Sequence, residues 1–306
     1  MVMSGPEPVT VADLVAEVET TLRAAGVPQP RRDAEILARE VLGVDAAHLV
    51  AHPDHPVSPD LCERIRAWGR RRAAGEPIQH ILGWREFWKD RFEVTPDVLI
   101  PRPETELLVE RGAALLGNGR DGGAPWILDL AAGSGCVGLS LLREAPAARL
   151  VLADVSLRAL SLAVRNARRL SLETRCAAVA GDGLAMLAAP AEGLFDLIVS
   201  NPPYLGRDEI AALPTEIRDH EPRAALWGGE DGLDFYRRWL GPAVNRLRGG
   251  GHLLMECGAG QWPALKRLLS EAGLSGSVFP DLAGIPRVFQ VTRPCPAAAV
   301  GESVRV

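Results

Sequence analysis

The stretch WILDLAAGSGCVGL, residues 126–139, decides the fold class of this chain. It begins with an apolar run, turns at Gly133-Ser134-Gly135, and continues with residues typical of a helix. Glycines let the backbone turn sharply and approach a ligand, and the free N–H groups of the following helix face the same crevice. The stretch therefore predicts the first strand, turn and helix of an α/β domain. The glycine pattern alone does not identify a ligand, because a purely structural turn can have the same sequence.

Apolar runs alternate with helical stretches along the rest of this region. The further runs are RLVLADV (149–155), TRCAAVAGD (174–182), FDLIVSN (195–201) and GGHLLMEC (250–257), and helices are expected near Val137, Leu157, Asp231 and Trp262. Such alternation predicts a mostly parallel sheet with helices on both faces. The segment 276–293 adds two extended runs with no helix between them. We therefore expect a seven-stranded sheet that closes with an antiparallel C-terminal pair.

The region before this sheet has a helical pattern. The segments 9–26, 30–43 and 58–75 repeat apolar residues at close to 3.6-residue spacing and end at glycines. Two extended runs then flank Lys89-Asp90, as in a hairpin. We expect a helical substrate-docking domain over 1–75, a β-hairpin connector over 76–100, the sheet domain over 101–293 and a flexible tail over 294–306.

Composition restricts the class of protein. The 306 residues carry a net charge of −5, which removes the simplest argument for nucleic-acid binding. No apolar run is long enough to span a membrane and no signal peptide is recognisable, so we expect a cytoplasmic protein. The five cysteines include no CxxC pair, and His52 and His55 lie in a proline-rich segment typical of a solvated loop. We expect no metal site.

Polar residues follow the second and third predicted strands, where an open parallel sheet binds its ligands. Asp154 ends a strand about 20 residues after the glycine turn, a position from which a carboxylate can accept both ribose hydroxyls of a nucleoside. Asp182 could accept a hydrogen bond from an adenine amino group. A helix cap is the plain alternative for Asp154, but Ser156 already suits that role. A nucleoside-type cofactor is expected, and because Gly138 completes GxGxxG, a nicotinamide cofactor stays open at this point.

The stretch SNPPYLG, residues 200–206, follows the fourth strand and separates these possibilities. A planar amide or amino nitrogen is a poor nucleophile, and fixed acceptors for its two N–H groups raise its electron density and orient it. The side-chain oxygen of Asn201 and the carbonyl of Pro202 can be those acceptors, because Pro202 and Pro203 stiffen the loop. Tyr204 can lie flat against the planar group. These residues predict methyl transfer to nitrogen, although Asn-Pro-Pro can also simply end a strand.

Together these motifs resemble class I S-adenosylmethionine-dependent methyltransferases that act on amino groups. More narrowly, GWREFW (83–88), VLIPRPETELLVE (98–110), EPRAALWGGEDGLDFYR (221–237) and LLMECGAGQ (253–261) resemble the release-factor glutamine methyltransferases, the HemK-type protein-(glutamine-N5) enzymes. The likeness covers residues 75–293, and residues 1–75 match only in type and position. The resemblance implies a Rossmann-like class I methyltransferase domain with a small N-terminal helical bundle.

The resemblance also implies an activity and a set of site residues. The activity is methylation of the glutamine N5 in the Gly-Gly-Gln motif of peptide chain release factors, with the N-terminal bundle gripping the factor. The loop 101–106 would cover the methionine end of the cofactor. The implied catalytic residues are Asn201, Pro202 and Tyr204; the substrate-binding residues are Asn201, Pro202, Pro203 and Tyr204; and the cofactor-binding residues are Ala131, Ala132, Gly133, Ser134, Gly135, Asp154, Asp182, Gly183 and Asn201.

Two departures from the family pattern affect the cofactor site. Ala131 and Ala132 stand where the family commonly has glycine and threonine, so a methyl group at 131 is expected to crowd the cofactor. Gly183 stands where the family often has a bulky residue, so a wall of the adenine pocket would come from elsewhere, with Leu184 as a candidate.

Three rival functions fit parts of the same pattern. A ribosomal-protein glutamine methyltransferase would use the same chemistry. An adenine-N6 DNA methyltransferase also uses an Asn-Pro-Pro-Tyr loop, on a flipped base, but the acidic N-terminal part counts against it. A cofactor-binding module without catalysis would account for Ala131 and Gly183. We expect release factors as partners and no direct nucleic-acid or membrane binding.

Overall fold

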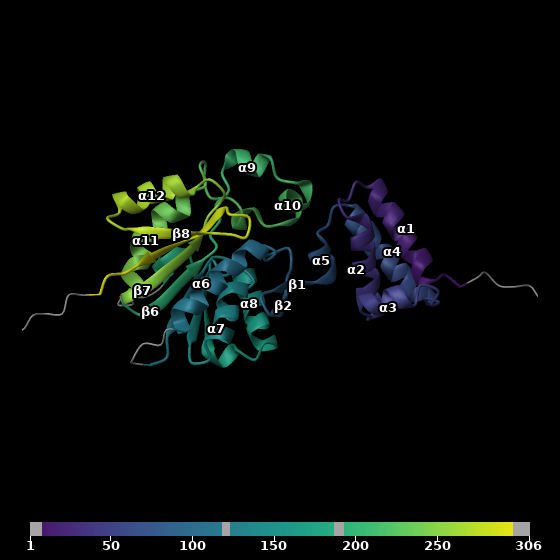
Figure 1. Ribbon diagram of the computed structural model, residues 1–306, viewed down its shortest axis with the longest axis horizontal. Helices are drawn as coiled ribbons and strands as arrows, with labels where there is room; N and C mark the ends of the chain where they lie inside the picture. The colour runs from purple at the N-terminus through teal and green to yellow at the C-terminus, as the bar shows by residue number, and fades with distance from the viewer. Residues whose placement is uncertain (1–7, 118–122, 187–192, 296–306) are drawn as a thin grey trace, which may run out of the picture. The chain divides into compact units, whose positions relative to one another are not determined.

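The computed structural model describes residues 8–117, 123–186 and 193–295 and divides them into two compact units (Figure 1). The first unit contains the described residues up to Trp84 together with Pro214–His220. The second contains the rest of the described chain. The expected connector over 76–100 is divided between the units, with residues 76–84 in the first and 85–100 in the second, and Pro214–His220 also belongs to the first unit. The expected tail over 294–306 lies outside the described residues from 296 onward.

The first unit is helical, as the residue spacing predicted. The three expected helices are α1 (Val11–Ala24), α2 (Pro30–Leu42) and α4 (Pro59–Ala73), and the structure adds the short helices α3 (Ala46–Ala51), α5 (Ile78–Leu82) and α10 (Thr215–His220). Helix α1 begins with a capping box in which Thr10 and Asp13 bind each other's backbone N–H. The added helices have five or six residues, too few for a 3.6-residue repeat to show in the sequence.

Most of the arginines on α4 are held by acidic side chains of the same unit. Arg66 pairs with Glu17, Arg70 with Glu63 and Arg71 with Glu76. Arg72 is buried, and its Nε lies 2.8 Å from Asp33 Oδ2 while its Nη2 lies 3.0 Å from Glu216 Oε2. These acidic partners neutralise the basic run of α4, and Arg72 ties α10 to the helical unit.

The second unit begins at Arg85, within the hairpin of β1 (Trp84–Phe87) and β2 (Asp90–Glu93), where the sequence predicted a hairpin. The seven-stranded sheet has the order β5-β4-β3-β6-β7-β9-β8. Its strands are β3 (Trp126–Leu130), β4 (Arg149–Asp154), β5 (Cys176–Ala180), β6 (Phe195–Ser200), β7 (Leu247–Glu256), β8 (Gly276–Pro280) and β9 (Pro286–Thr292). The first five pair in parallel, and β9 runs antiparallel to both β7 and β8. The expected sheet, with its antiparallel C-terminal pair, is confirmed.

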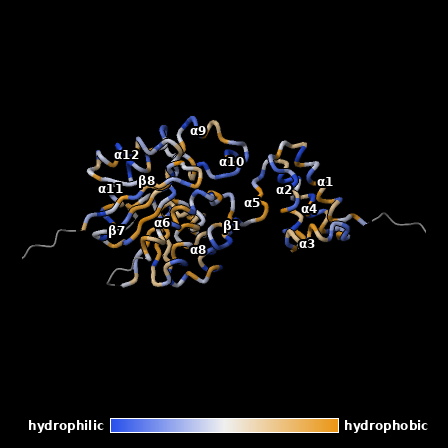
Figure 2. The backbone as a smooth tube through the Cα atoms, in the orientation of Figure 1, coloured by the Kyte–Doolittle hydropathy of each residue, from blue (hydrophilic) through white to orange (hydrophobic). Residues whose placement is uncertain are grey.

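Helices cover both faces of the sheet because alternate strand residues point to opposite sides. Ile127 and Leu197 pack with α6 (Glu106–Gly117), α7 (Cys136–Glu144) and α8 (Leu157–Arg169). Helix α6 follows the short helix η1 (Pro103–Thr105), α7 follows β3, and α8 follows β4. Leu128 and Ile198 point the other way and pack with α11 (Asp234–Arg246) and α12 (Trp262–Glu271). Figure 2 shows hydrophobic colours through the centre of the second unit, whereas the helices change between hydrophobic and hydrophilic colours.

The remaining elements are short. They are η2 (Glu173–Arg175), η3 (Gly183–Met186), α9 (Arg207–Ala211) and η4 (Arg223–Ala225). None of the helices in the described ranges is long and apolar enough to cross a membrane.

The buried ion pair of Arg72 gives a stability prediction. Arg72→Ala should lower the free energy of unfolding by about 3–5 kcal/mol, because it leaves the carboxylate of Asp33 buried without its partner. Arg70→Ala is the matched control: its pair with Glu63 is exposed, so we expect a loss of at most about 1 kcal/mol. Urea unfolding followed by circular dichroism measures both. Equal effects for the two variants would contradict the role of the buried pair.

Candidate active site

A cavity of the second unit lies at the C-terminal ends of the parallel strands. Its lining comes from the loops after β3, β4, β5 and β6, from residues 97–105 and 222–225, and from α11. The sequence placed the ligand site at this edge of the sheet, because parallel strands all end there. Of the predicted site residues, those that line the cavity are Ala131, Ala132, Gly133, Ser134, Asp154, Asp182, Gly183, Asn201 and Pro203. Gly135, Pro202 and Tyr204 do not line it.

Strand register brings the functional residues into one row. Leu130 on β3 pairs with Ala153 on β4 and with Ser200 on β6, and Ser200 pairs with Met255 on β7. The next residue of each strand or loop therefore lies beside its neighbours at the same edge. We call these four residues, Asp154, Ala131, Asn201 and Glu256, the edge row.

The glycine loop after β3 has an unusual backbone. Ala131, Gly133 and Gly135 all have positive φ, at 63°, 54° and 78°. At Gly133 a Cβ would meet no protein atom within 4 Å, so the space beside its backbone is open. At Gly135 a Cβ would lie 3.1 Å from Ala163 and Leu139, which requires a glycine where α7 begins. The loop thus exposes bare backbone to the cavity.

Ala131 adopts a conformation that a side chain disfavours. A left-handed backbone costs an L-residue with a Cβ roughly 1–2 kcal/mol, whereas glycine adopts it freely. The left-handed backbone therefore explains why the family commonly has glycine at this position. That the methyl group crowds the cofactor stays a prediction.

Asp154 fixes the glycine loop with its carboxylate. Its Oδ2 accepts a hydrogen bond from the Gly133 N–H at 2.9 Å, and its Oδ1 accepts one from the Ser156 N–H at 2.8 Å. Burial raises the pKa of Asp154, and these backbone hydrogen bonds oppose the rise. Ser156 itself caps α8 by accepting from the Ala159 N–H. Each oxygen of Asp154 keeps a further lone pair with which it can accept a ligand hydroxyl.

Asp129, one strand residue before this loop, is a buried carboxyl that the sequence reasoning did not select. Its Oδ2 accepts from the Gly138 N–H at 2.8 Å, and burial raises its pKa to about 7. A Cβ on Gly138 would lie 2.8 Å from Asp129 Oδ2 and 2.9 Å from Leu150 Cδ1. The third glycine of the pattern therefore allows α7 to pack closely against the sheet.

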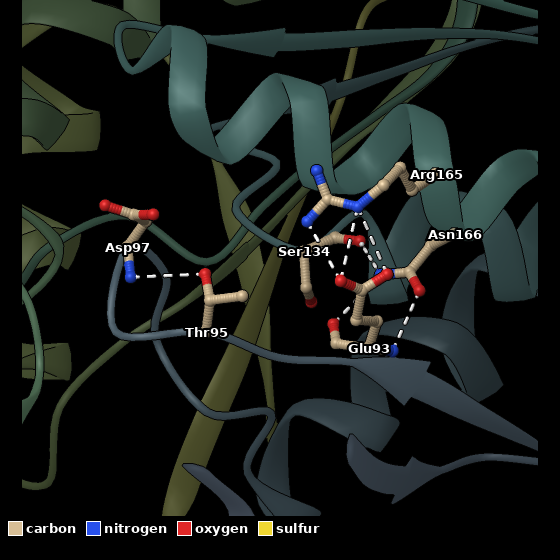
Figure 3. A network of polar contacts seen from close by, with 6 residues as sticks. All are labelled: Glu93, Thr95, Asp97, Ser134, Arg165 and Asn166. Carbon is tan, nitrogen blue, oxygen red and sulfur yellow. Dashed lines mark hydrogen bonds and ion pairs between the residues drawn. The ribbon is translucent and has the colours of Figure 1, made fainter. Parts of the chain in front are cut away.

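A second support of the glycine loop comes from the buried Asn166 on α8 (Figure 3). Its Nδ2 donates to the carbonyls of Ser134 at 3.0 Å and Glu93 at 3.1 Å, while its Oδ1 accepts from the Glu93 N–H at 2.8 Å. Arg165 on the same helix pairs with the Glu93 carboxylate at 2.9 Å. The glycine loop and the end of β2 are thus held by one amide side chain.

The walls near Asp182 differ from the expected ones. Leu184 is buried in the core and does not line the cavity, so the suggestion that it supplies a wall is wrong; Phe235 and Trp239 of α11 line the cavity there. A Cβ on Gly183 would lie 2.5 Å from Trp239 Nε1, so the glycine leaves room for the indole. Trp239 Nε1–H is buried without a hydrogen-bond partner among the described residues. Asp182 is exposed and pairs with Arg238 at 2.6 Å.

The loop after β6 is held by hydrogen bonds to neighbouring elements. Asn201 Nδ2 donates to Thr105 Oγ1 at 3.1 Å, and the Tyr204 hydroxyl donates to Glu256 Oε1 at 3.1 Å. Pro202 and Pro203 are buried. Burial raises the pKa of Tyr204 above its ordinary value, so the phenol stays protonated. Sequence reasoning did not select Thr105 or Glu256, although both stand in the motifs that carried the resemblance.

No group of three or more His, Cys, Asp or Glu residues within the described ranges could hold a metal ion. His48, His52 and His55 lie near one another, with ring centroids of His48 4.4 Å from His52 and 6.5 Å from His55, and all three are exposed.

Comparisons with known proteins give matches to family models, to relatives and to solved structures. A family model described as "PrmC N-terminal domain" matches residues 13–83, and one described as "Methyltransferase small domain" matches residues 107–217. A release factor glutamine methyltransferase of Bradyrhizobium diazoefficiens is 42% identical, with 89% of this chain and 91% of that protein covered. One of Bordetella pertussis is 44% identical over 85% of this chain and 93% of its own length.

Among solved structures, the chain is similar to the N-terminal domain of human METTL16 in complex with SAH. The TM-score is 0.50 at 15% identity, with 72% of this chain and 82% of that one covered. At this identity the likeness concerns the fold alone.

The backbone of Ala131 gives the first prediction for this site. Ala131→Gly should raise the free energy of unfolding by up to about 1 kcal/mol, because relief of the left-handed strain outweighs the added freedom of the unfolded chain. Ala132→Gly, one residue on and without positive φ, should lower it by about 0.4–1 kcal/mol. Urea unfolding measures both, and a loss of stability in Ala131→Gly would contradict the strain.

Gly183 gives the second prediction. Gly183→Ala should weaken binding of S-adenosylhomocysteine about tenfold, since the new Cβ displaces the indole of Trp239 and the backbone at φ +64° becomes strained. Isothermal titration calorimetry measures the Kd. Gly241→Ala in α11 is the control, because a Cβ there meets nothing within 4 Å and the Kd should not change. Equal affinity in Gly183→Ala and the unaltered protein would show that Trp239 does not shape the site.

Proposed function

Because the chain belongs to the family of release factor glutamine methyltransferases, we propose that it methylates a release factor. The reaction transfers a methyl group from S-adenosylmethionine to the side-chain amide nitrogen N5 of glutamine in the Gly-Gly-Gln motif. The observation that carries the proposal is the edge row, in which Asn201 lies beside the glycine loop and lines the same cavity. Nucleophile and methyl donor would therefore meet where Asn201 and the glycine loop adjoin.

The residues at the glycine loop fit the cofactor. The open space at Gly133 admits a ligand against bare backbone, and the free lone pairs of Asp154 suit ribose hydroxyls. Trp239 forms part of the cavity wall, and its buried Nε1–H has no hydrogen-bond partner among the described residues. When bound, S-adenosylmethionine supplies an electrophilic methyl group on a sulfonium.

The chain's own contribution is to orient the amide nitrogen. Asn201 Oδ1 and the Pro202 carbonyl would accept its two N–H groups, and the buried prolines keep these acceptors in place. Tyr204, held through its hydroxyl by Glu256, would pack against the planar amide. Alignment of the reacting atoms can account for about 7–11 kcal/mol of the barrier. No strong base is required beforehand, because the nitrogen becomes acidic only after methylation.

The helical unit would grip the release factor. In support, its family match covers residues 13–83 and its basic residues are largely neutralised by acidic partners, which leaves a surface suited to protein more than to phosphate. Peptide release takes place in the cytoplasm, so the proposed substrate implies that compartment.

Methylation of a ribosomal-protein glutamine stays the second candidate, because it requires the same acceptors. The family match favours release factors. An adenine-N6 DNA methyltransferase and a non-catalytic cofactor-binding protein are disfavoured by relatives that share about 40% identity over nearly the whole chain.

The substrate is tested with intact proteins. We expect mass spectrometry to find one added methyl group, 14 Da, on the Gly-Gly-Gln glutamine of a release factor after incubation with S-adenosylmethionine. Ribosomal proteins and duplex DNA, offered in parallel, should stay unmodified. Methylation of either of these and not of the release factor would overturn the proposal.

Asn201 tests the mechanism. Asn201→Ala should lower kcat about 100- to 1,000-fold, the range for loss of one preorganised hydrogen bond, with a smaller change in cofactor Kd. Asn245→Ala, an exposed amide on α11, is the matched control and should keep full activity. An active Asn201→Ala variant would contradict the role of its side-chain oxygen.

A further inference from the structure

We propose that Arg102, held in place by Glu221, binds the carboxylate at the amino-acid end of the cofactor. The inference rests on the proposed function, because it takes S-adenosylmethionine as the ligand of the cavity. The sequence placed the loop 101–106 over the methionine end of the cofactor but selected no residue of it. Glu221 is then a positioning residue, since it acts on the ligand only through Arg102.

The cavity has an uneven distribution of charge. Among the described residues that line it, Arg102 is the only lysine or arginine. The carboxyl side chains of the same lining are Asp97, Asp129, Asp154 and Asp182. The ionised members of this set would repel a carboxylate of the ligand, whereas Arg102 would attract it. S-adenosylmethionine has one carboxylate, so Arg102 is the cation of the lining with which that group can pair.

The position of Arg102 in the cavity suits the amino-acid end of the cofactor. The Thr105 N–H donates to the Arg102 carbonyl at 3.1 Å, and Thr105 Oγ1 accepts from Asn201 Nδ2 at 3.1 Å. In the proposed function the reacting methyl group lies beside Asn201, and the nucleoside extends from there toward the loops after β4 and β5. The amino-acid end, on the other side of the sulfonium, would then lie near residues 101–105.

Glu221 fixes the Arg102 side chain from the buried side. Glu221 Oε1 accepts from Arg102 Nη2 at 2.6 Å, and Glu221 Oε2 accepts from the Ile100 N–H at 3.3 Å. The side chain of Glu221 is 1% exposed and that of Arg102 is 29% exposed. Arg102 lines the cavity, but Glu221 does not. A ligand would therefore meet the guanidinium and not the carboxylate behind it.

The backbone of Arg102 is fixed as well. A proline restricts the residue before it to extended conformations, and Arg102, which precedes Pro103, has φ −96° and ψ 145°. A guanidinium carries several N–H donors in a planar fork, and the hydrogen bond to Glu221 uses a donor of Nη2. Arg102 can therefore bind a second carboxylate from a fixed position.

Cofactor binding tests the inference without any protein substrate. Isothermal titration calorimetry compares S-adenosylhomocysteine with its decarboxylated analogue, which keeps the nucleoside and the ammonium group but lacks the carboxylate. We expect the unaltered protein to bind S-adenosylhomocysteine about 10- to 100-fold more tightly than the analogue, the range for hydrogen bonds to a charged group. In Arg102→Met the Kd of S-adenosylhomocysteine should rise by the same factor, whereas that of the analogue should change less than about threefold.

Two milder variants keep the test decisive if Arg102→Met does not fold, since that variant leaves the buried carboxylate of Glu221 without its partner. Arg102→Lys keeps a cation for Glu221 but lacks the planar fork, and should reduce the preference for S-adenosylhomocysteine at least about fivefold. Glu221→Gln keeps the shape but no longer holds the guanidinium by charge, and should reduce the preference about threefold. Arg207→Met is the matched control: it removes an exposed arginine that pairs with Glu230, and both Kd values should stay unchanged.

The two ligands separate binding of the carboxylate from a purely structural role of Arg102. A disturbed loop would weaken both ligands alike, so an unchanged preference in the Arg102 variants would overturn the inference even if the release factor is methylated. An unchanged preference in Glu221→Gln would reject the positioning role of Glu221. A preference that depends on Arg102, in a protein that methylates no release factor, would leave the inference standing and reject only the substrate. Absence of S-adenosylhomocysteine binding in the unaltered protein would overturn both.

Discussion

Parallel pairing of four neighbouring strands is the constraint on which the site depends. The register that places Ala153, Leu130, Ser200 and Met255 side by side also places the residues after them at one edge. The carboxylate of Asp154, the bare backbone loop at Ala131, the amide of Asn201 and the buried carboxyl of Glu256 thus become neighbours, although 125 positions of the sequence separate Ala131 from Glu256. A shift of one residue in any of these strands would move its side chain to the opposite face of the sheet.

Buried polar groups then fix the loops that follow the strands. Asp154 and Asn166 hold the glycine loop from two sides, and Thr105 and Glu256 hold the loop after β6. In each case the group is kept from bulk water, which strengthens the hydrogen bonds and makes an unmatched partner costly. The same burial raises the pKa of Asp129 and of Glu256 to about 7, above the ordinary value of a carboxyl. Burial thus both strengthens the hydrogen bonds that hold the loops and raises the pKa of the nearby carboxyls.

The sequence predicted the sheet, its antiparallel end and the three longer N-terminal helices, because these depend on apolar periodicity over many residues. It also predicted which loops line the cavity, since strand ends and their polar residues are visible locally. It did not predict Asn166, Trp239 or Glu256. Their roles arise from contacts with residues that lie 32 to 56 positions away in the sequence. Leu184 was suggested as a wall by proximity in sequence, but it faces the core while Trp239 of α11 reaches the cavity. The left-handed backbone of Ala131 was equally hidden, because only its departure from the family pattern was visible.

The account is tested most directly by a crystal structure of the protein with S-adenosylhomocysteine and a Gly-Gly-Gln peptide bound. It predicts the ribose hydroxyls on Asp154, and the glutamine amide nitrogen within hydrogen-bond distance of Asn201 Oδ1 and the Pro202 carbonyl. It also predicts Asn201 Nδ2 still bound to Thr105 and Glu256 still accepting from Tyr204. A glutamine held away from Asn201, or an Asn201 amide that turns its NH2 group to the substrate, would contradict it.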